Sequence, residues 1–301
     1  MPVSAPNTTD ACTMAPSLAA MLAIHNSHWP ECSIDHGPLE TGWRTLAQVF
    51  EDPVAMEGLL AAQAELTAGL DRKGQAAYLV GYHAYFLSLP AAVGLVATGI
   101  VPNLAAERTA VRFEQHVHDD EDHAHLHFHF RLLDGICRGD APGDAAAPQD
   151  FARRETGSLS DVLRVELEAN FEPLIERLHA MTRLSRNALW RQAADSVAFA
   201  FLEVGRDLNR EDEAKAAAMA VLKAPGSPFS NPQLQFVKVV VPDVVAARSA
   251  SRTYASRGGC CRYYTAPGGS VCANCVLQRP DDRDRLLAEH LREHLTGVHA
   301  A

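Results

Sequence analysis

Positive charge is missing from the beginning of the chain, because no lysine or arginine precedes Arg44. A secretory signal peptide begins with a basic region, so the apolar stretch from Ala15 to Ile24 does not fit one. We therefore expect a cytoplasmic protein, and the sequence is also compatible with a peripheral attachment to a membrane. In the cytoplasm thiols stay reduced, and clustered cysteines are more often metal ligands than disulfides.

Charge of either sign is missing between Gly74 and Ala106, a stretch long enough to span a bilayer. The stretch nevertheless contains His83, Pro90 and three tyrosines, and no clusters of lysine or arginine flank it as topology anchors. Proline disfavours helix at the residue before it. We therefore expect two buried helices that separate at Leu89–Pro90, and no stable membrane span.

A glycine-rich dinucleotide fingerprint is also missing, since "GLVATGIV" lacks the required spacing. We therefore expect neither NAD(P)H nor a flavin to bind this chain. The net charge is −10, with 37 acidic and 27 basic residues, which argues against nucleic acid as the main partner. With 301 residues, of which 47% are hydrophobic, the chain can bury a large core without disulfides.

Apolar residues recur at helical spacing in two long parts of the chain, from Gly42 to about Leu70 and again from about 158 to 222. "LQFVKVVVPD" predicts a strand, and "PDDRDRLLAEHLREHL" predicts a terminal helix. Residues 1–38 are rich in Ser, Thr, Pro and Asn and predict a loosely ordered arm with one short helix. We expect an α+β protein with a mostly helical body at 1–245 and a small C-terminal lobe at 246–301.

The segment from Glu107 to Leu133 predicts a β-hairpin, because apolar and polar residues alternate on both sides of an acidic "DDED" turn. The predicted cross-strand pairs are His116–His125, Glu114–His127 and Arg112–His129. One face is then apolar and the other is rich in histidine. A solvated face is the simplest interpretation, a ligand-contacting face with His125 and His127 is the second, and a dedicated metal site is the third.

Four of the seven cysteines lie in "RGGCCRYYTAPGGSVCANCVLQ", which runs from Arg257 to Gln278: Cys260, Cys261, Cys272 and Cys275. Disulfides, a zinc site and an iron–sulfur cluster are the alternatives. Zinc loops usually place two or more residues between cysteines. Two adjacent side chains on an extended backbone point in opposite directions, which suits a wider cluster better than one ion. The glycines of this segment permit tight turns that bring amides near the sulfurs.

The spacing C-C-x10-C-x2-C near the C-terminus resembles that of the FhuF-like ferric siderophore reductases. The resemblance implies that Cys260, Cys261, Cys272 and Cys275 ligate a [2Fe–2S] cluster, with no catalytic residue apart from the cluster. It further implies a cytoplasmic oxidoreductase that reduces a ferric siderophore by one electron. The partners would be the ferric siderophore and an external electron donor, either a ferredoxin or a flavin- or NAD(P)H-dependent reductase.

Arg262 and Tyr263 lie within the cysteine segment and are candidates to contact the siderophore or the donor, although packing within the lobe is the simpler role. Two other functions remain open at this point. One is a non-catalytic siderophore-binding protein with structural zinc, and the other is an iron–sulfur electron carrier or redox sensor. The remaining cysteines are scattered and show no ligand spacing.

Overall fold

The computed structural model describes residues 16–117, 124–133, 137–139, 158–243 and 248–296, and at 16, 114–117, 124–128, 137–139, 243 and 248 it describes the backbone alone. Its α-helices are α1 (Pro16–His28), α2 (Leu46–Glu51), α3 (Pro53–Leu66), α4 (Arg72–Val93), α5 (Leu159–Thr182), α6 (Arg186–Asp207), α7 (Glu211–Leu222) and α8 (Pro280–Thr296). The short turns η1 (Pro30–Cys32) and η3 (Tyr263–Thr265) are 3₁₀, and η2 (Gly94–Thr98) is a π-helix. Together with three small sheets these helices make an α+β fold, which confirms the expected class.

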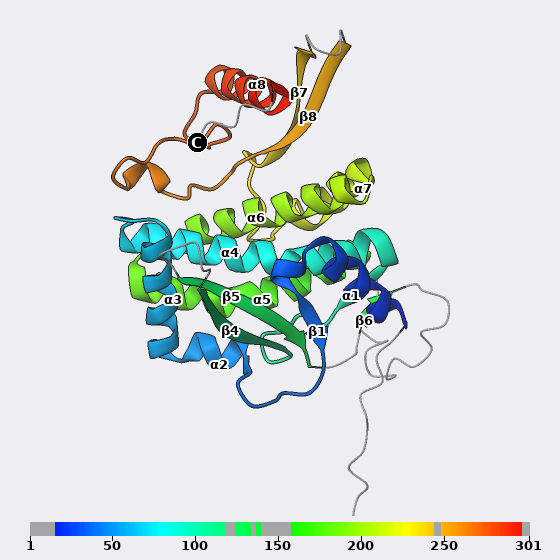
Figure 1. Ribbon diagram of the computed structural model, residues 1–301, viewed down its shortest axis with the longest axis vertical. Helices are drawn as coiled ribbons and strands as arrows, with labels where there is room; N and C mark the ends of the chain where they lie inside the picture. Colours follow the sequence, from blue (N-terminus) through cyan, green and yellow to red (C-terminus); the bar gives the residue numbers. More distant parts are fainter. Residues whose placement is uncertain (1–15, 118–123, 134–136, 140–157, 244–247, 297–301) are drawn as a thin grey trace, which may run out of the picture.

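The largest sheet has the strand order β1–β5–β4–β2, in which β1 (Ile34–His36) runs parallel to β5 (Ala124–Leu132). The strands β4 (Thr109–Val117) and β2 (Arg44–Thr45) complete it in antiparallel fashion. Separately, β3 (Ile100–Pro102) pairs with β6 (Cys137–Gly139), and β7 (Gln235–Asp243) pairs with β8 (Arg248–Ser256). In Figure 1 the helices α4 and α6 lie between the β4–β5 hairpin and the β7–β8 hairpin with α8.

The predicted hairpin between Glu107 and Leu133 is confirmed, and so is its register. β4 and β5 pair His116 with His125, Glu114 with His127 and Arg112 with His129. Val111 and Phe130 also pair and are buried, as expected for the apolar face. The side chains of His125 and His127 lie outside the described residues, as does the predicted turn at 118–123, so their contact with a ligand stays a prediction.

The uncharged stretch forms one helix rather than two. α4 continues through Pro90 and ends in η2, so the predicted break at Leu89–Pro90 is wrong. Proline removes one helical hydrogen bond, but Pro90 is buried in the core, where packing outweighs that loss. Within the described part of the chain, Arg72–Thr98 is long and apolar enough to cross a membrane, but 78% of its apolar 18-residue stretch is buried inside the protein. The burial agrees with the expected core helix.

The one short helix expected within the arm at 1–38 is present as α1, but from Pro16 onward the arm is packed into the core rather than loosely ordered. Residues 1–15 lie outside the described part. α1 buries Leu18 and Met21 completely, and Trp29 and Ile34 follow them into the core. The buried positions of this helix are three or four residues apart, so that one face packs against the body: Leu18, Met21, Leu22 and His25. The polar composition of the surrounding segment concealed this pattern.

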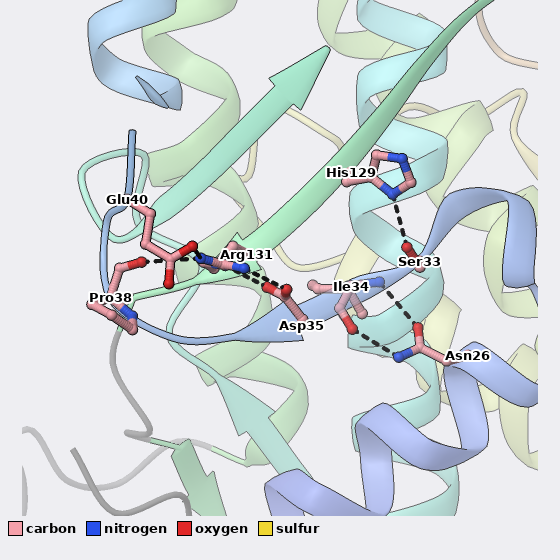
Figure 2. A network of polar contacts seen from close by, with 8 residues as sticks. All are labelled: Asn26, Ser33, Ile34, Asp35, Pro38, Glu40, His129 and Arg131. Atoms are coloured by element: carbon pink, nitrogen blue, oxygen red, sulfur yellow. Dashed lines mark hydrogen bonds and ion pairs between the residues drawn. The ribbon is translucent and has the colours of Figure 1, made fainter. Parts of the chain in front are cut away.

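Side chains fasten the strand after α1 to its neighbours (Figure 2). Asn26 of α1 donates to the carbonyl of Ile34 at 2.9 Å and accepts from its amide at 3.0 Å. Arg131 of β5 donates to both oxygens of Asp35 at 2.7 and 2.8 Å, and it also pairs with Glu40 at 3.0 Å. These contacts hold β1 at the edge of the sheet and join α1 and the segment at Glu40 to the sheet.

The C-terminal lobe contains the β7–β8 hairpin, α8 and the cysteine segment between β8 and α8 (Figure 1). The strand at 234–243 and the terminal helix are confirmed, whereas β8 was not expected. β7 lies before the predicted division at 245/246, yet it pairs with β8 over its whole length. The β7–β8 hairpin therefore spans the predicted division between body and lobe.

Candidate metal centre

The cysteine segment leaves the end of β8, forms η3 and returns to the start of α8. Cys260, Cys261 and Cys272 are half-buried, Cys275 is buried, and all four are free thiols. Within the segment, the amide of Cys275 donates to the carbonyl of Cys272 at 3.0 Å, which makes the C-x2-C loop a compact turn. No disulfide joins these four cysteines in the structure.

The four thiols are close enough to affect one another. A hydrogen bond between Cys261 and Cys272 lowers the pKa of Cys261 to about 5 and raises that of Cys272, since one proton is shared between the two sulfurs. Burial raises the pKa of Cys260, and the neighbouring Cys275 and Cys261 raise it further. Among the residues that the structure describes, no group of three or more Cys, His, Asp or Glu side chains is arranged to hold a single metal ion.

Backbone amides point at the sulfur atoms. The amide of Leu277 donates to Sγ of Cys275 at 3.4 Å. The amides of Arg262 and Tyr263 form hydrogen bonds that lower the pKa values of Cys260 and Cys261, respectively. Hydrogen bonds of this kind stabilise thiolates and tune iron–sulfur centres. The donor set and these amides therefore fit a cluster held by four thiolates.

A buried carboxylate on α6 anchors the segment just before its first cysteine. Asp195 is completely buried and accepts hydrogen bonds from the amides of Gly258 at 2.7 Å and Gly259 at 2.9 Å. It also pairs with Nε of Arg257 at 3.2 Å, and Nη2 of Arg257 donates to Gln192 at 2.5 Å. Burial raises the pKa of Asp195 to about 6 against the opposing effects of Arg257 and the two amides, so the carboxyl group is ionised at neutral pH.

Close packing explains the glycine at 259. A Cβ added there would lie 2.7 Å from the backbone nitrogen of Gln192 and 2.8 Å from the backbone carbon of Arg191. Backbone atoms of a helix cannot move aside as the end of a side chain can. The segment therefore lies directly on α6, and only glycine permits this approach immediately before Cys260.

Arg262 fastens the middle of the segment to α4. Its Nη2 lies 2.6 Å from Oδ2 of Asp71, the residue that caps the N-terminus of α4. Tyr263, next to it, is 38% exposed. The guanidinium of Arg262 is thus engaged within the protein, and Tyr263 stays accessible at the surface. Their contacts with a substrate or donor remain predictions.

Two residues near the site were not singled out from the sequence. One is Asp195, which lies among the mostly apolar buried positions of α6, and a carboxylate in such a place is a signal that could have been used. The other is Tyr78 on α4, whose pKa is raised to about 12, mainly by burial and next by the charge of Cys261. Its ring lies 6.2 Å from that of Tyr82, which is exposed.

Comparison with known proteins supports the interpretation of this segment. Residues 257–277 match the family model described as the FhuF 2Fe-2S C-terminal domain. A search of curated proteins finds no match. The matched range contains all four cysteines and ends at Leu277, whose amide contacts Cys275. The C-terminal segment of this chain is therefore similar to the [2Fe–2S] domain of the FhuF family, and a [2Fe–2S] cluster is the cofactor that it implies.

Proposed function

We propose that this protein is a ferric siderophore reductase that transfers one electron to the iron of a siderophore complex in the cytoplasm. The observation that carries the proposal is the match of residues 257–277, which contains four free cysteines: Cys260, Cys261, Cys272 and Cys275. Backbone amides donate to three of their sulfurs, those of Cys260, Cys261 and Cys275. These four cysteines are the proposed ligands. Reduction releases iron, because the hard oxygen donors of a siderophore hold Fe(II) less well than Fe(III).

When bound, a [2Fe–2S] cluster supplies a one-electron carrier matched to the Fe(III)/Fe(II) step. The protein residues hold this carrier at the surface. Three of the four cysteines are only half-buried. Large apolar side chains beside them are exposed: Tyr263, Tyr264, Val271 and Leu277. This exposed apolar rim supports the approach of a bulky ferric complex to the thiolates, with Tyr263 as a contact.

The electron donor is proposed to be a separate protein, a ferredoxin or a flavin- or NAD(P)H-dependent reductase. The support is the sequence, which contains no glycine-rich dinucleotide fingerprint. Arg262, His125 and His127 are further proposed contacts for the siderophore. Histidine and arginine donate hydrogen bonds, and the oxygen atoms of a siderophore accept them.

Anaerobic purification followed by iron, sulfide and zinc analysis tests the proposal. We expect two irons and two sulfides per chain, and an EPR signal after reduction with dithionite. Ferric siderophores of the hydroxamate and catecholate types are then added in turn to the reduced protein. Reoxidation by one of them, with formation of Fe(II), supports the reductase.

Other outcomes contradict it in distinct ways. One zinc per chain and no colour would remove the redox mechanism and favour a binding protein with structural zinc. A normal cluster that no ferric complex reoxidises would favour an electron carrier or a redox sensor.

A further inference from the structure

The ion pair between Asp195 and Arg257 lies behind the cysteine segment, away from solvent. Asp195 is fully buried, and the side chain of Arg257 is 12% exposed. Burying an ion pair costs desolvation free energy, and apolar residues of similar size often stabilise a protein equally well. Since Arg257 lies only three residues before Cys260, this ion pair can influence the cysteine site through its charges as well as through its hydrogen bonds.

The cation of this pair lies beside the cysteine segment. The amide of Arg257 donates to the carbonyl of Asn274, which lies between Cys272 and Cys275, at 3.1 Å. Arg257 is also three residues before Cys260, and its side chain is only 12% exposed. The guanidinium is therefore a largely buried charge next to the backbone that carries both pairs of cysteines.

The hydrogen bonds of the pair determine where this cation lies. Asp195 binds Nε of Arg257, and Gln192, one turn earlier on α6, binds Nη2 at 2.5 Å. The same carboxylate holds the amides of Gly258 and Gly259. One rigid helix thus positions both the cation and the backbone that leads into Cys260.

We propose that Arg257 raises the reduction potential of the cysteine site and that Asp195 is the positioning residue that holds Arg257 and partly offsets its charge. The inference rests on the proposed function, because it requires a redox-active cluster on the four thiolates. Reduction adds one electron, and hence one negative charge, to the site. A nearby cation in a region of low dielectric stabilises that charge, and an anion opposes it.

The two charges therefore predict opposite shifts. Arg257→Gln removes the cation and lowers the potential. Asp195→Asn keeps the size of the side chain and one oxygen acceptor but removes the anion, so it raises the potential. We expect each substitution to change the ratio of reduced to oxidised protein at a fixed potential by about tenfold, which corresponds to about 59 mV for one electron. A purely structural role predicts no such opposition of sign.

Anaerobic redox titration of the full-length protein, followed by EPR and visible circular dichroism, measures these shifts without any siderophore. Arg257→Lys keeps the charge and should keep the potential close to that of the wild type. The matched controls are Arg186→Gln and Glu176→Gln, which break an exposed ion pair at the start of the same helix α6. Exposed charges are screened by water and salt, so these controls should not change the potential.

Shifts of the same sign in Arg257→Gln and Asp195→Asn, or no shift in either, would overturn the inference. If Asp195→Asn loses its iron, Gln192→Glu takes its place, because it adds an anion beside Arg257 and should lower the potential. Loss of iron from every one of these variants, Arg257→Lys included, would show that the pair serves assembly alone and would also overturn it. Zinc in the wild-type protein would instead defeat the proposed function itself.

Discussion

The helical body and the C-terminal lobe differ in what stabilises them. The body has a large continuous core in which Phe171, Phe201 and Phe229 are completely buried. Among the described residues of the lobe, the hydrophobic core consists of four buried side chains: Val239, Val241, Leu287 and Leu291. So small a core gives little stability, and small units of this kind usually depend on a metal or another crosslink. We therefore expect the lobe to depend on its cofactor and on its polar contacts with the body, and the body to depend on neither.

The strongest way to test this difference is to remove one ligand. We expect Cys272→Ser to abolish or severely destabilise the cluster, because the hydroxyl of serine is a poor replacement for a thiolate. The far-UV circular dichroism of the helices should remain. Iron analysis, visible absorbance and circular dichroism measure both effects.

Cys32→Ala is the matched control for that substitution. Cys32 is buried in the body, where burial raises its pKa to about 12, so it is an inert thiol. This variant should keep its full iron content. Loss of the helical signal in Cys272→Ser would contradict a lobe whose folding is separable from that of the body.

The sequence predicts those elements that depend on residues close together in the chain. Helical spacing predicts the helices from 158 to 222, and alternation predicts the register of the β4–β5 hairpin. Cysteine spacing identifies the segment that matches the [2Fe–2S] domain model. The rest depends on tertiary packing. The continuity of α4 through Pro90 and the burial of α1 follow from the core that surrounds them. β8 has the polar sequence "RSASRTYAS" and is a strand because it pairs with β7. Asp195 and Arg257 are 62 residues apart in the sequence, and only the folded structure brings them into contact.

The second test creates one cavity in each core. Leu174 of α5 and Leu287 of α8 are both almost completely buried. Replacement of a buried leucine by alanine costs about 2–5 kcal/mol. We expect Leu174→Ala to lower the stability of the whole chain in urea, as monitored by circular dichroism.

We expect Leu287→Ala to act locally instead. It should increase amide hydrogen exchange in β7, β8 and α8 and promote loss of iron, with little change in the unfolding of the body. Equal effects of the two variants on global unfolding would show that body and lobe unfold as one cooperative unit. That result would contradict the proposed difference in what stabilises them.

The third test uses pH and concerns the body. Burial lowers the pKa of His83 to about 4, although a hydrogen bond with Asn170 opposes the shift. The folded state therefore binds fewer protons than the unfolded state between pH 6.5 and about 4. This contribution to stability is complete above pH 6.5 and is lost as the pH falls toward 4. The resulting loss between pH 7.5 and 5 is about 2 kcal/mol.

Urea unfolding of the body at pH 7.5 and at pH 5 measures this loss. In His83→Gln, which keeps a partner for Asn170, the difference between the two pH values should shrink by about 2 kcal/mol. His28→Gln, at an exposed position of α1, is the control and should leave the difference unchanged. An undiminished pH dependence in His83→Gln would rule out this histidine as its source.

The smallest expected effect is at the contact between lobe and body made by Arg262 and Asp71. Their side chains are 25% and 45% exposed, and ion pairs in such places contribute about 0–1 kcal/mol. Arg262→Gln and Asp71→Asn should therefore lower stability equally and slightly, and both should keep iron. Asparagine can still accept the hydrogen bond from Gly74 that caps α4, so Asp71→Asn isolates the loss of charge. If Arg262 also contacts a ferric siderophore, only Arg262→Gln will raise KM, and equal KM values in the two variants would limit Arg262 to joining the lobe to the body.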